Sequence, residues 1–178
     1  MNIKTIVVGM LQTNCYIVER GNTCIIIDPG DEADKILSNI ESNKKVLGIF
    51  VTHSHDDHVG AVADLMTSLK CPMYSFSNLS EGVNTFENFK FKVIRFPGHK
   101  EDCVAFYFED DKTMFVGDFI FKGSIGRYDL EGASSHDMKQ SIAKVLNYDK
   151  DIILYPGHGP KTVLSDEINT LNYFMNII

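Results

Sequence analysis

The chain has 178 residues, a length that suits one globular domain. Lys and Arg total 17 against 24 Asp and Glu, and the resulting net charge of -7 disfavours binding to nucleic acids. Hydrophobic residues make up 44% and charged residues 23%, a balance typical of folded proteins that excludes a disordered chain. We expect a single domain over residues 1–178.

The cysteines and the N-terminus predict a compartment. The four cysteines form no Cys-x-x-Cys pair, which disfavours a zinc knuckle, a redox motif or a disulfide framework. The first residues lack the apolar core and cleavage site of a signal peptide, and no apolar run is long enough to span a membrane. We therefore expect a cytoplasmic protein without a membrane partner. Nothing in the sequence specifies an oligomeric state.

The first part of the chain alternates predicted strands with predicted helices. Apolar residues spaced three and four apart from Ala33 to Ile40 predict a surface helix, and the same spacing recurs from Val59 to Met66. A Gly21-Asn22 pair predicts a tight turn between two strands. The apolar, largely β-branched runs predict strands at 3–8, 15–19, 24–27 and 46–51.

The second part is rich in predicted strands and closes with helices. Residues 89–93 alternate apolar and charged, as a half-buried strand does. Ser134, followed three residues later by Asp137, resembles a capping box that opens a helix. A last helical face spans 168–175. The other predicted strands cover 104–108 and 113–116, joined as a hairpin, and 152–155. Sheet layers covered by outer helices are the expected architecture.

Three of the six histidines fall within one short segment, His53-Ser54-His55-Asp56-Asp57-His58. The segment follows a predicted strand, so an extended turn would point His53 and His55 the same way. Asp57 and His58 would then begin a helix and point elsewhere. Imidazole and carboxylate groups are the usual ligands of transition metals, and two ligand pairs can serve two metal ions.

Three further ligand-type residues each follow an apolar strand-like run: His99, Asp118 and His158. A glycine precedes each one, and glycine permits the sharp turn that a ligand leaving a strand needs. Strand ends collect functional groups at one edge of a sheet, so these residues can converge with the first segment. We interpret the set as a metal site.

Two other residues have simpler readings. His136, near a predicted helix start, is expected to be an ordinary surface or core residue. Asp28, in an Asp-Pro-Gly turn after a buried strand, favours turn formation over a supporting contact to a metal ligand. For the set of ligand-type residues as a whole, a metal-binding module without catalytic activity is the alternative interpretation. Structural zinc sites are usually closed and rich in cysteine, which this cluster is not.

The ligand motif, with PGH at 97–99, GDFIF at 117–121, GSIGRYDLEG at 123–132 and PGHGP at 156–160, resembles the metallo-β-lactamase superfamily and, within it, the glyoxalase II-like hydrolases. The resemblance implies an α/β fold, an αββα sandwich of two mixed sheets packed face to face with helices on the outer faces. It also implies two divalent metal ions. The ligand types suit Zn, Fe or Mn, with Zn the metal usual in the family.

The resemblance also assigns roles by position. His53, His55 and His99 would hold one metal ion, Asp57, His58 and His158 the other, and Asp118 would bridge them. A metal-bound hydroxide, oriented by Asp57, would attack the carbonyl of a thioester or small ester, with lactoylglutathione-type compounds the leading substrate class. The alternatives on the same scaffold are a persulfide dioxygenase with one iron, or a lactonase.

The chain departs from the family at two places. His99-Lys100-Glu101-Asp102-Cys103 stands where the family usually has His-Thr-x-Gly-Ser, so Lys100 either points to solvent or meets an anionic substrate. The additional C-terminal helical domain of classical glyoxalase II enzymes is not expected here. Arg127 matches a basic substrate-contacting position of the family, and an ordinary surface arginine is the competing interpretation.

Overall fold

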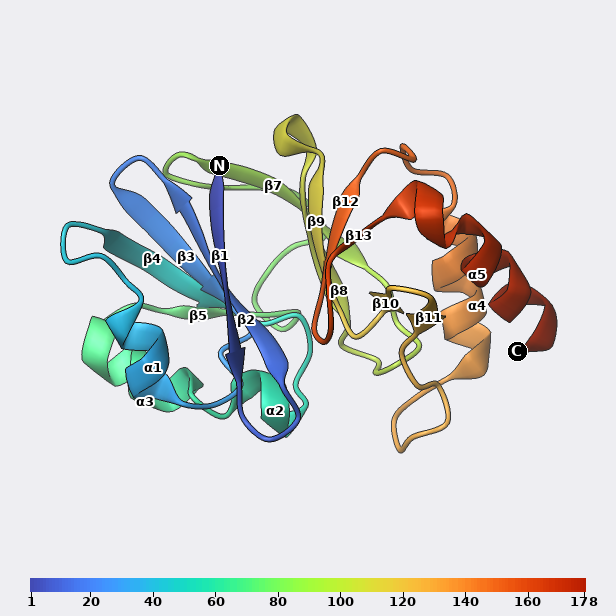
Figure 1. Cartoon of the computed structure of the whole chain (residues 1–178), viewed down its shortest axis with the longest axis horizontal. Coiled ribbons are helices and arrows are strands. Elements are labelled where there is room, and N and C mark those ends of the chain that lie inside the picture. Colours follow the sequence, from blue (N-terminus) through green and yellow to red (C-terminus); the bar gives the residue numbers. More distant parts are fainter.

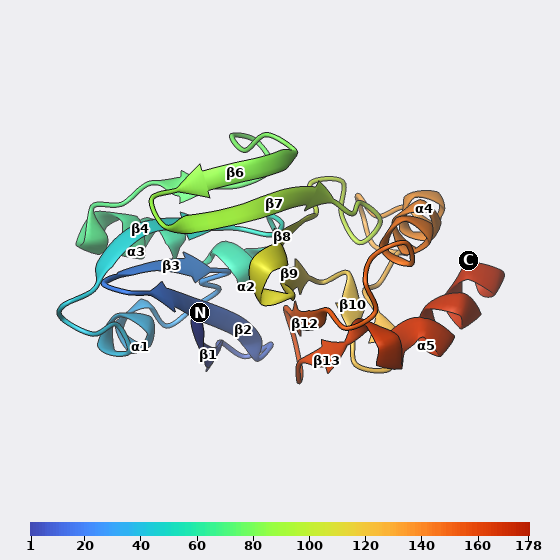
Figure 2. The ribbon, with the colours of Figure 1, turned by 90° about the horizontal axis from the view of Figure 1, so that it is seen from above.

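A computed structural model describes residues 1–178 of the chain. Two β-sheets pack face to face, and helices cover the outer face of each (Figure 1). Seen from above, the helices over 33–38 and 62–69 lie toward one end of the molecule and those over 135–145 and 164–177 toward the other, with the short helix over 56–59 between them (Figure 2). Both sheets contain parallel and antiparallel pairs, so the αββα sandwich expected from the sequence is confirmed.

The first sheet has five strands in the order β1-β2-β3-β4-β5. β1 to β3 pair antiparallel, and β3 to β5 pair parallel. The strands are β1 (Asn2–Val8), β2 (Thr13–Arg20), β3 (Thr23–Ile27), β4 (Lys45–Phe50) and β5 (Met73–Tyr74). The helices of this half are α1 (Ala33–Ser38), α2 (Asp56–Val59) and α3 (Val62–Leu69).

The second sheet has six strands in the order β13-β12-β9-β8-β7-β6, and only β12 and β9 pair parallel. The strands are β6 (Gly82–Phe86), β7 (Phe89–Arg95), β8 (Val104–Phe108), β9 (Thr113–Gly117), β12 (Ile153–Pro156) and β13 (Thr162–Val163). A 3-10 turn (Glu109–Asp111), the hairpin of β10 (Ile120–Phe121) and β11 (Ser124–Ile125), and helices α4 (Ser135–Val145) and α5 (Leu164–Ile177) complete the half. None of the helices has the length and apolarity of a membrane span.

Successive side chains of a strand point to opposite faces of its sheet, and the buried ones form three apolar layers. In β3, Ile25 and Ile27 face the second sheet, whereas Cys24 and Ile26 face α1 and α3. The layer between the sheets is aromatic, and fully buried Phe50 contacts rings from both sheets. A strand buried on both faces reads as a continuous apolar run, which is why the sequence marked these segments clearly. This core fixes the strand ends that carry the site.

The structure differs from the sequence-based expectation at the helix predicted over 59–66. It is divided into α2 and α3, because the chain passes the 29–30 turn at this point. Ala61 N–H donates to the carbonyl of Pro29, and a Cβ on Gly60 would lie 2.3 Å from the carbonyl oxygen of Gly30. Hydrophobic spacing alone does not report such a contact. The short strands β5, β6, β10, β11 and β13 were also missed, since pairing partners rather than composition define them.

Candidate metal centre

The seven ligand-type residues of the motif lie together where strands of both sheets end. His53 follows β4, Asp118 follows β9 directly, and His158 comes two residues after β12. His99 stands in the loop after β7. In three groups of three, the ligand atoms lie within 4.8 Å of one another: His53, His55 and His99; His53, His58 and Asp118; Asp57, His58 and His158.

Hydrogen-bond partners fix which nitrogen each imidazole presents. The Nδ1 of His99 lies 2.8 Å from the carbonyl oxygen of Arg127, and that of His158 lies 3.1 Å from the carbonyl oxygen of Leu11. A carbonyl oxygen carries no hydrogen, so each Nδ1 must donate its own. In the neutral form of each ring the single hydrogen is therefore on Nδ1, and Nε2 has the lone pair with which imidazole binds metal.

A buried carboxylate fixes His53 and His58 in the same way. Asp28 accepts hydrogen bonds from His58 Nδ1 (3.0 Å) and from the Thr52 hydroxyl (2.6 Å). Since that hydroxyl has given its hydrogen to Asp28, it accepts from His53 Nδ1 at 3.2 Å. Asp28 thus turns the Nε2 atoms of both histidines toward the centre, a role that turn formation does not require. It adopts a φ of 50° while doing so.

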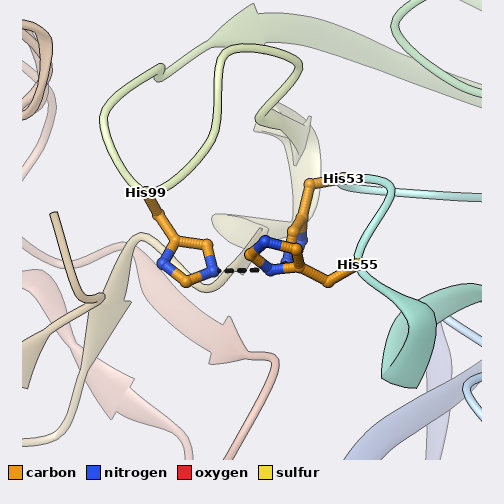
Figure 3. A group of neighbouring side chains, drawn as sticks. All are labelled: His53, His55 and His99. Atoms are coloured by element: carbon orange, nitrogen blue, oxygen red, sulfur yellow. Dashed lines mark hydrogen bonds between the residues drawn. The ribbon is translucent and has the colours of Figure 1, made fainter. Parts of the chain in front are cut away.

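The first group consists of imidazoles alone (Figure 3). His55 Nδ1 lies 3.0 Å from His53 Nε2 and 2.9 Å from His99 Nε2. A single proton on His55 Nδ1 can bond only one of these neighbours at a time, whereas a cation satisfies all three nitrogens. Nitrogens sharing one ion at about 2.0–2.1 Å lie roughly 3.3 Å apart in tetrahedral geometry, close to the observed spacing.

The second group contains the carboxylates. Asp118 lies between the two groups, with Oδ1 3.3 Å from His58 Nε2, and Oδ2 3.6 Å from His99 Nε2 and 3.4 Å from His158 Nε2. Asp57 Oδ2 is 3.2 Å from His158 Nε2. Two buried atoms, His58 Nε2 and Asp118 Oδ1, have no hydrogen-bond partner. Orphaned buried polar atoms facing one another fit a divalent cation between them.

The electrostatics suit cation binding. Burial lowers the pKa of His53 and His55, which keeps both imidazoles neutral. Burial also lowers the pKa of His58, but the carboxylates of Asp28 and Asp118 outweigh it and raise the pKa to about 10. Hydrogen bonds to Asp118 and Asp57 raise the pKa of His158 to about 10. In the metal-free protein, protons on the second group therefore neutralise its carboxylates.

The three glycines that precede ligand-type residues leave room for the site. A Cβ on Gly157 would lie 2.1 Å from Asp118 Oδ1 and 2.6 Å from His58 Cε1, so any side chain there would displace ligand-type groups. Gly98 has a φ of 143°, and a Cβ would meet the backbone of Met138 at 2.5 Å. Gly117 has a φ of 53°, and its Cβ would lie 2.4 Å from Thr52 Oγ1. All three predicted ligand-preceding glycines are therefore required by space, and Gly98 and Gly117 also by backbone angle.

Sequence reasoning missed two residues at the start of β2. Thr13 donates its hydroxyl hydrogen to Asp57 Oδ2 at 2.8 Å. The amide nitrogen of the Asn14 side chain donates to the carbonyls of Pro156 and Gly159, which flank the turn before and after His158. Both residues are at most 3% exposed. The only available signal was a polar pair directly before the apolar run over residues 15–18.

The remaining candidates occupy distinct places. The Lys100 ammonium donates to Ser54, and the Arg127 guanidinium pairs with Asp129 at the surface, so the carbonyl of Arg127 rather than its cation contacts the centre. His136 is exposed and hydrogen-bonded within its own helix, which confirms the surface interpretation.

Comparison with known proteins agrees with this geometry. A family model described as "Metallo-beta-lactamase superfamily" matches residues 8–82 and 77–158. A Haemophilus influenzae protein named hydroxyacylglutathione hydrolase GloC is 31% identical over 212 residues, covering 99% of this chain and 99% of its own. The solved structure of BLEG-1 B3 metallo-beta-lactamase has a TM-score of 0.90 and 28% identity, covering 97% of this chain and 99% of its own.

A second solved structure carries metal ions. TTHA1623 in a di-iron-bound form has a TM-score of 0.86 and 35% identity, covering 94% of this chain and 98% of its own. The His/Asp groups described above are consistent with a dinuclear metal site. The chain belongs to the metallo-beta-lactamase superfamily and carries the His/Asp metal site of a metallo-hydrolase.

Proposed function

We propose that this protein is a dinuclear-metal hydrolase of thioesters or small esters, with glutathione thioesters of hydroxy acids as the leading substrate class. The single observation that carries the proposal is the meeting of seven ligand-type side chains, among which two buried atoms, His58 Nε2 and Asp118 Oδ1, have no hydrogen-bond partner. The relative named hydroxyacylglutathione hydrolase supports the substrate class.

Each of the two ligand groups would hold one metal ion. His53, His55 and His99 would hold one ion through nitrogens alone. Asp57, His58 and His158 would hold the other, and Asp118 would bridge, since its two oxygens face both groups. Zinc is the metal we propose. Iron is the competing choice, because a related structure is di-iron-bound.

The charge of the centre favours attack on a carbonyl. Two carboxylates contribute -2 and neutral imidazoles nothing, so two divalent ions leave the centre positive by formal count. If bound, such ions would supply a water of lowered pKa, about 7, and positive charge for the oxyanion and for a thiolate leaving group. A substrate carbonyl and an anionic nucleophile are both attracted to this charge.

Asp57 is the proposed catalytic residue. Hydrogen bonds from His158 and from the Thr13 hydroxyl hold the pKa of its carboxyl well below its usual range, although burial opposes them. The carboxylate therefore stays ionised at neutral pH and can accept a hydrogen bond from an attacking water. Thr13 holds Oδ2 in place. Asp28 orients His58 in this proposal, and Arg127 is the candidate contact for an anionic substrate group.

The test combines metal analysis of purified protein with a substrate panel. We expect about two metal ions per chain, hydrolysis of glutathione thioesters, and loss of turnover in His55→Ala and Asp118→Ala with the fold retained. Unchanged turnover in both variants would refute the site. Oxygen uptake with glutathione persulfide and one iron per chain would instead identify a dioxygenase. Faster cleavage of acyl-homoserine lactones than of thioesters would identify a lactonase.

A further inference from the structure

Two side chains of the loop that carries His99 form hydrogen bonds to Ser54, the residue between His53 and His55. Ser54 is exposed and lies outside every helix and strand, so no backbone ladder holds it. Its N–H donates to Asp102 Oδ2 at 3.1 Å. Lys100 Nζ donates to its carbonyl oxygen at 3.0 Å and to its hydroxyl oxygen at 2.7 Å. Every polar group of Ser54 is thus bound by two side chains of the other loop.

The loop that carries His99, residues 96–103, is closed by its own backbone hydrogen bonds. The N–H groups of Gly98 and Cys103 both approach the carbonyl oxygen of Lys100 at 3.4 Å, and Phe96 N–H donates to the carbonyl of Cys103 at 3.1 Å. A further backbone bond joins the two segments, from Val104 N–H to the carbonyl of Thr52 at 2.9 Å. A closed turn lets Lys100 and Asp102 present their charged ends at fixed positions.

The consequence concerns the three-histidine group. His55 Nδ1 must lie between His53 Nε2 and His99 Nε2, which belong to two segments far apart in the chain. A rotation of the backbone at Ser54 would swing His55 away from both, because no regular structure holds the chain between them. Fixing the N–H and C=O of Ser54 removes that freedom.

We infer that Lys100 and Asp102 are positioning residues for the metal site formed by His53, His55 and His99, acting through Ser54. The inference rests on the proposed metal-dependent function. It gives a role to the segment in which this chain departs from the pattern of the glyoxalase II-like hydrolases: a lysine and a carboxylate here hold the neighbouring ligand loop directly.

The test measures binding of Co²⁺ to metal-free protein through its visible absorption, a readout that a merely structural role would not move. Lys100→Met keeps the apolar stem and removes the three donors, and Asp102→Ala removes the acceptor. We expect each to weaken Co²⁺ binding by roughly tenfold or more and to alter the absorption bands. Asp102→Asn retains an acceptor oxygen and should recover most of the affinity. Glu101→Gln, an exposed change in the same turn, is the matched control and should leave binding unchanged.

The outcomes separate this inference from the proposed function. Wild-type Co²⁺ affinity and spectrum in both Lys100→Met and Asp102→Ala would overturn it, as would equal losses in Asp102→Ala and Asp102→Asn. Weakened Co²⁺ binding in the variants, with a wild-type protein that hydrolyses neither thioesters nor small esters, would support the positioning role and refute the hydrolase. If the other variants fail to fold, Ser54→Ala tests the inference instead. It removes only the hydroxyl contact and should lose a smaller share of the Co²⁺ affinity.

Discussion

Asp28→Asn tests how the buried carboxylate behind the centre controls two of its histidines. An amide keeps the size of the side chain and one acceptor oxygen for the Thr52 N–H, 2.7 Å away. Its NH₂ group now faces His58 Nδ1 and can only donate to it. His58 must then place its own hydrogen on Nε2, the atom that faces Asp118. The substitution therefore turns a ligand lone pair into an N–H.

The size of the effect follows from burial. The side chains of His58 and Asp28 are 0% and 2% exposed, and His58 has its pKa raised from 6.5 to about 10 in the metal-free protein. Removing one partner of a buried ion pair costs about 3–5 kcal/mol. Because the pKa is raised, this stability is complete below about pH 6.5 and is lost as pH rises through about 10. Loss of a carboxylate behind a metal ligand weakens metal affinity about 10–100-fold.

The assay is urea unfolding of wild type and Asp28→Asn in a chelator, near pH 6 and near pH 10, together with metal titration. We expect a stability difference of roughly 3 kcal/mol at the lower pH that narrows at the higher one. Asp64→Asn, an exposed change on α3, is the matched control. Equal metal affinity in Asp28→Asn and wild type, with no pH-dependent difference in stability, would refute the reasoning.

Three further predictions follow from the same geometry. Gly157→Ala should lower the metal content measured by elemental analysis, because its Cβ would lie 2.1 Å from Asp118 Oδ1. Metal binding at pH 7 should release close to two protons, measured by calorimetry in buffers of different ionisation enthalpy, since His58 and His158 have a pKa of about 10 without metal and must lose a proton to bind it. Phe50→Ala should cost about 3–5 kcal/mol of unfolding free energy while the site still binds metal.

Each of these has a contradicting outcome. A full metal complement in Gly157→Ala would mean that the surrounding side chains move aside at little cost. Gly159→Ala, where φ is 73° and a Cβ meets nothing, reports the effect of backbone strain without a clash. Metal binding without proton release would show that the second histidine group is already neutral. A loss below 1 kcal/mol in Phe50→Ala would deny that the inter-sheet layer is closely packed.

The sequence by itself determined the alternation of strands and helices in the first part, the layered architecture and the identity of the ligand-type residues. Continuous apolar runs report strands buried on both faces, and three histidines within one segment form a dense local signal. The cap at Ser134 was also readable, and its hydroxyl accepts from Asp137 N–H at 3.1 Å. All of these depend on neighbours in the chain.

Only the tertiary structure decided how the site is supported. Thr13 contacts Asp57 across 44 positions, Asn14 contacts Pro156 across 142, and Lys100 reaches Ser54 across 46. Asp28 looked like a turn residue because its role lies in a partner 30 positions away. A side chain's hydrogen-bond partners depend on which strand ends meet, and that is set by the packing of two sheets rather than by any local pattern.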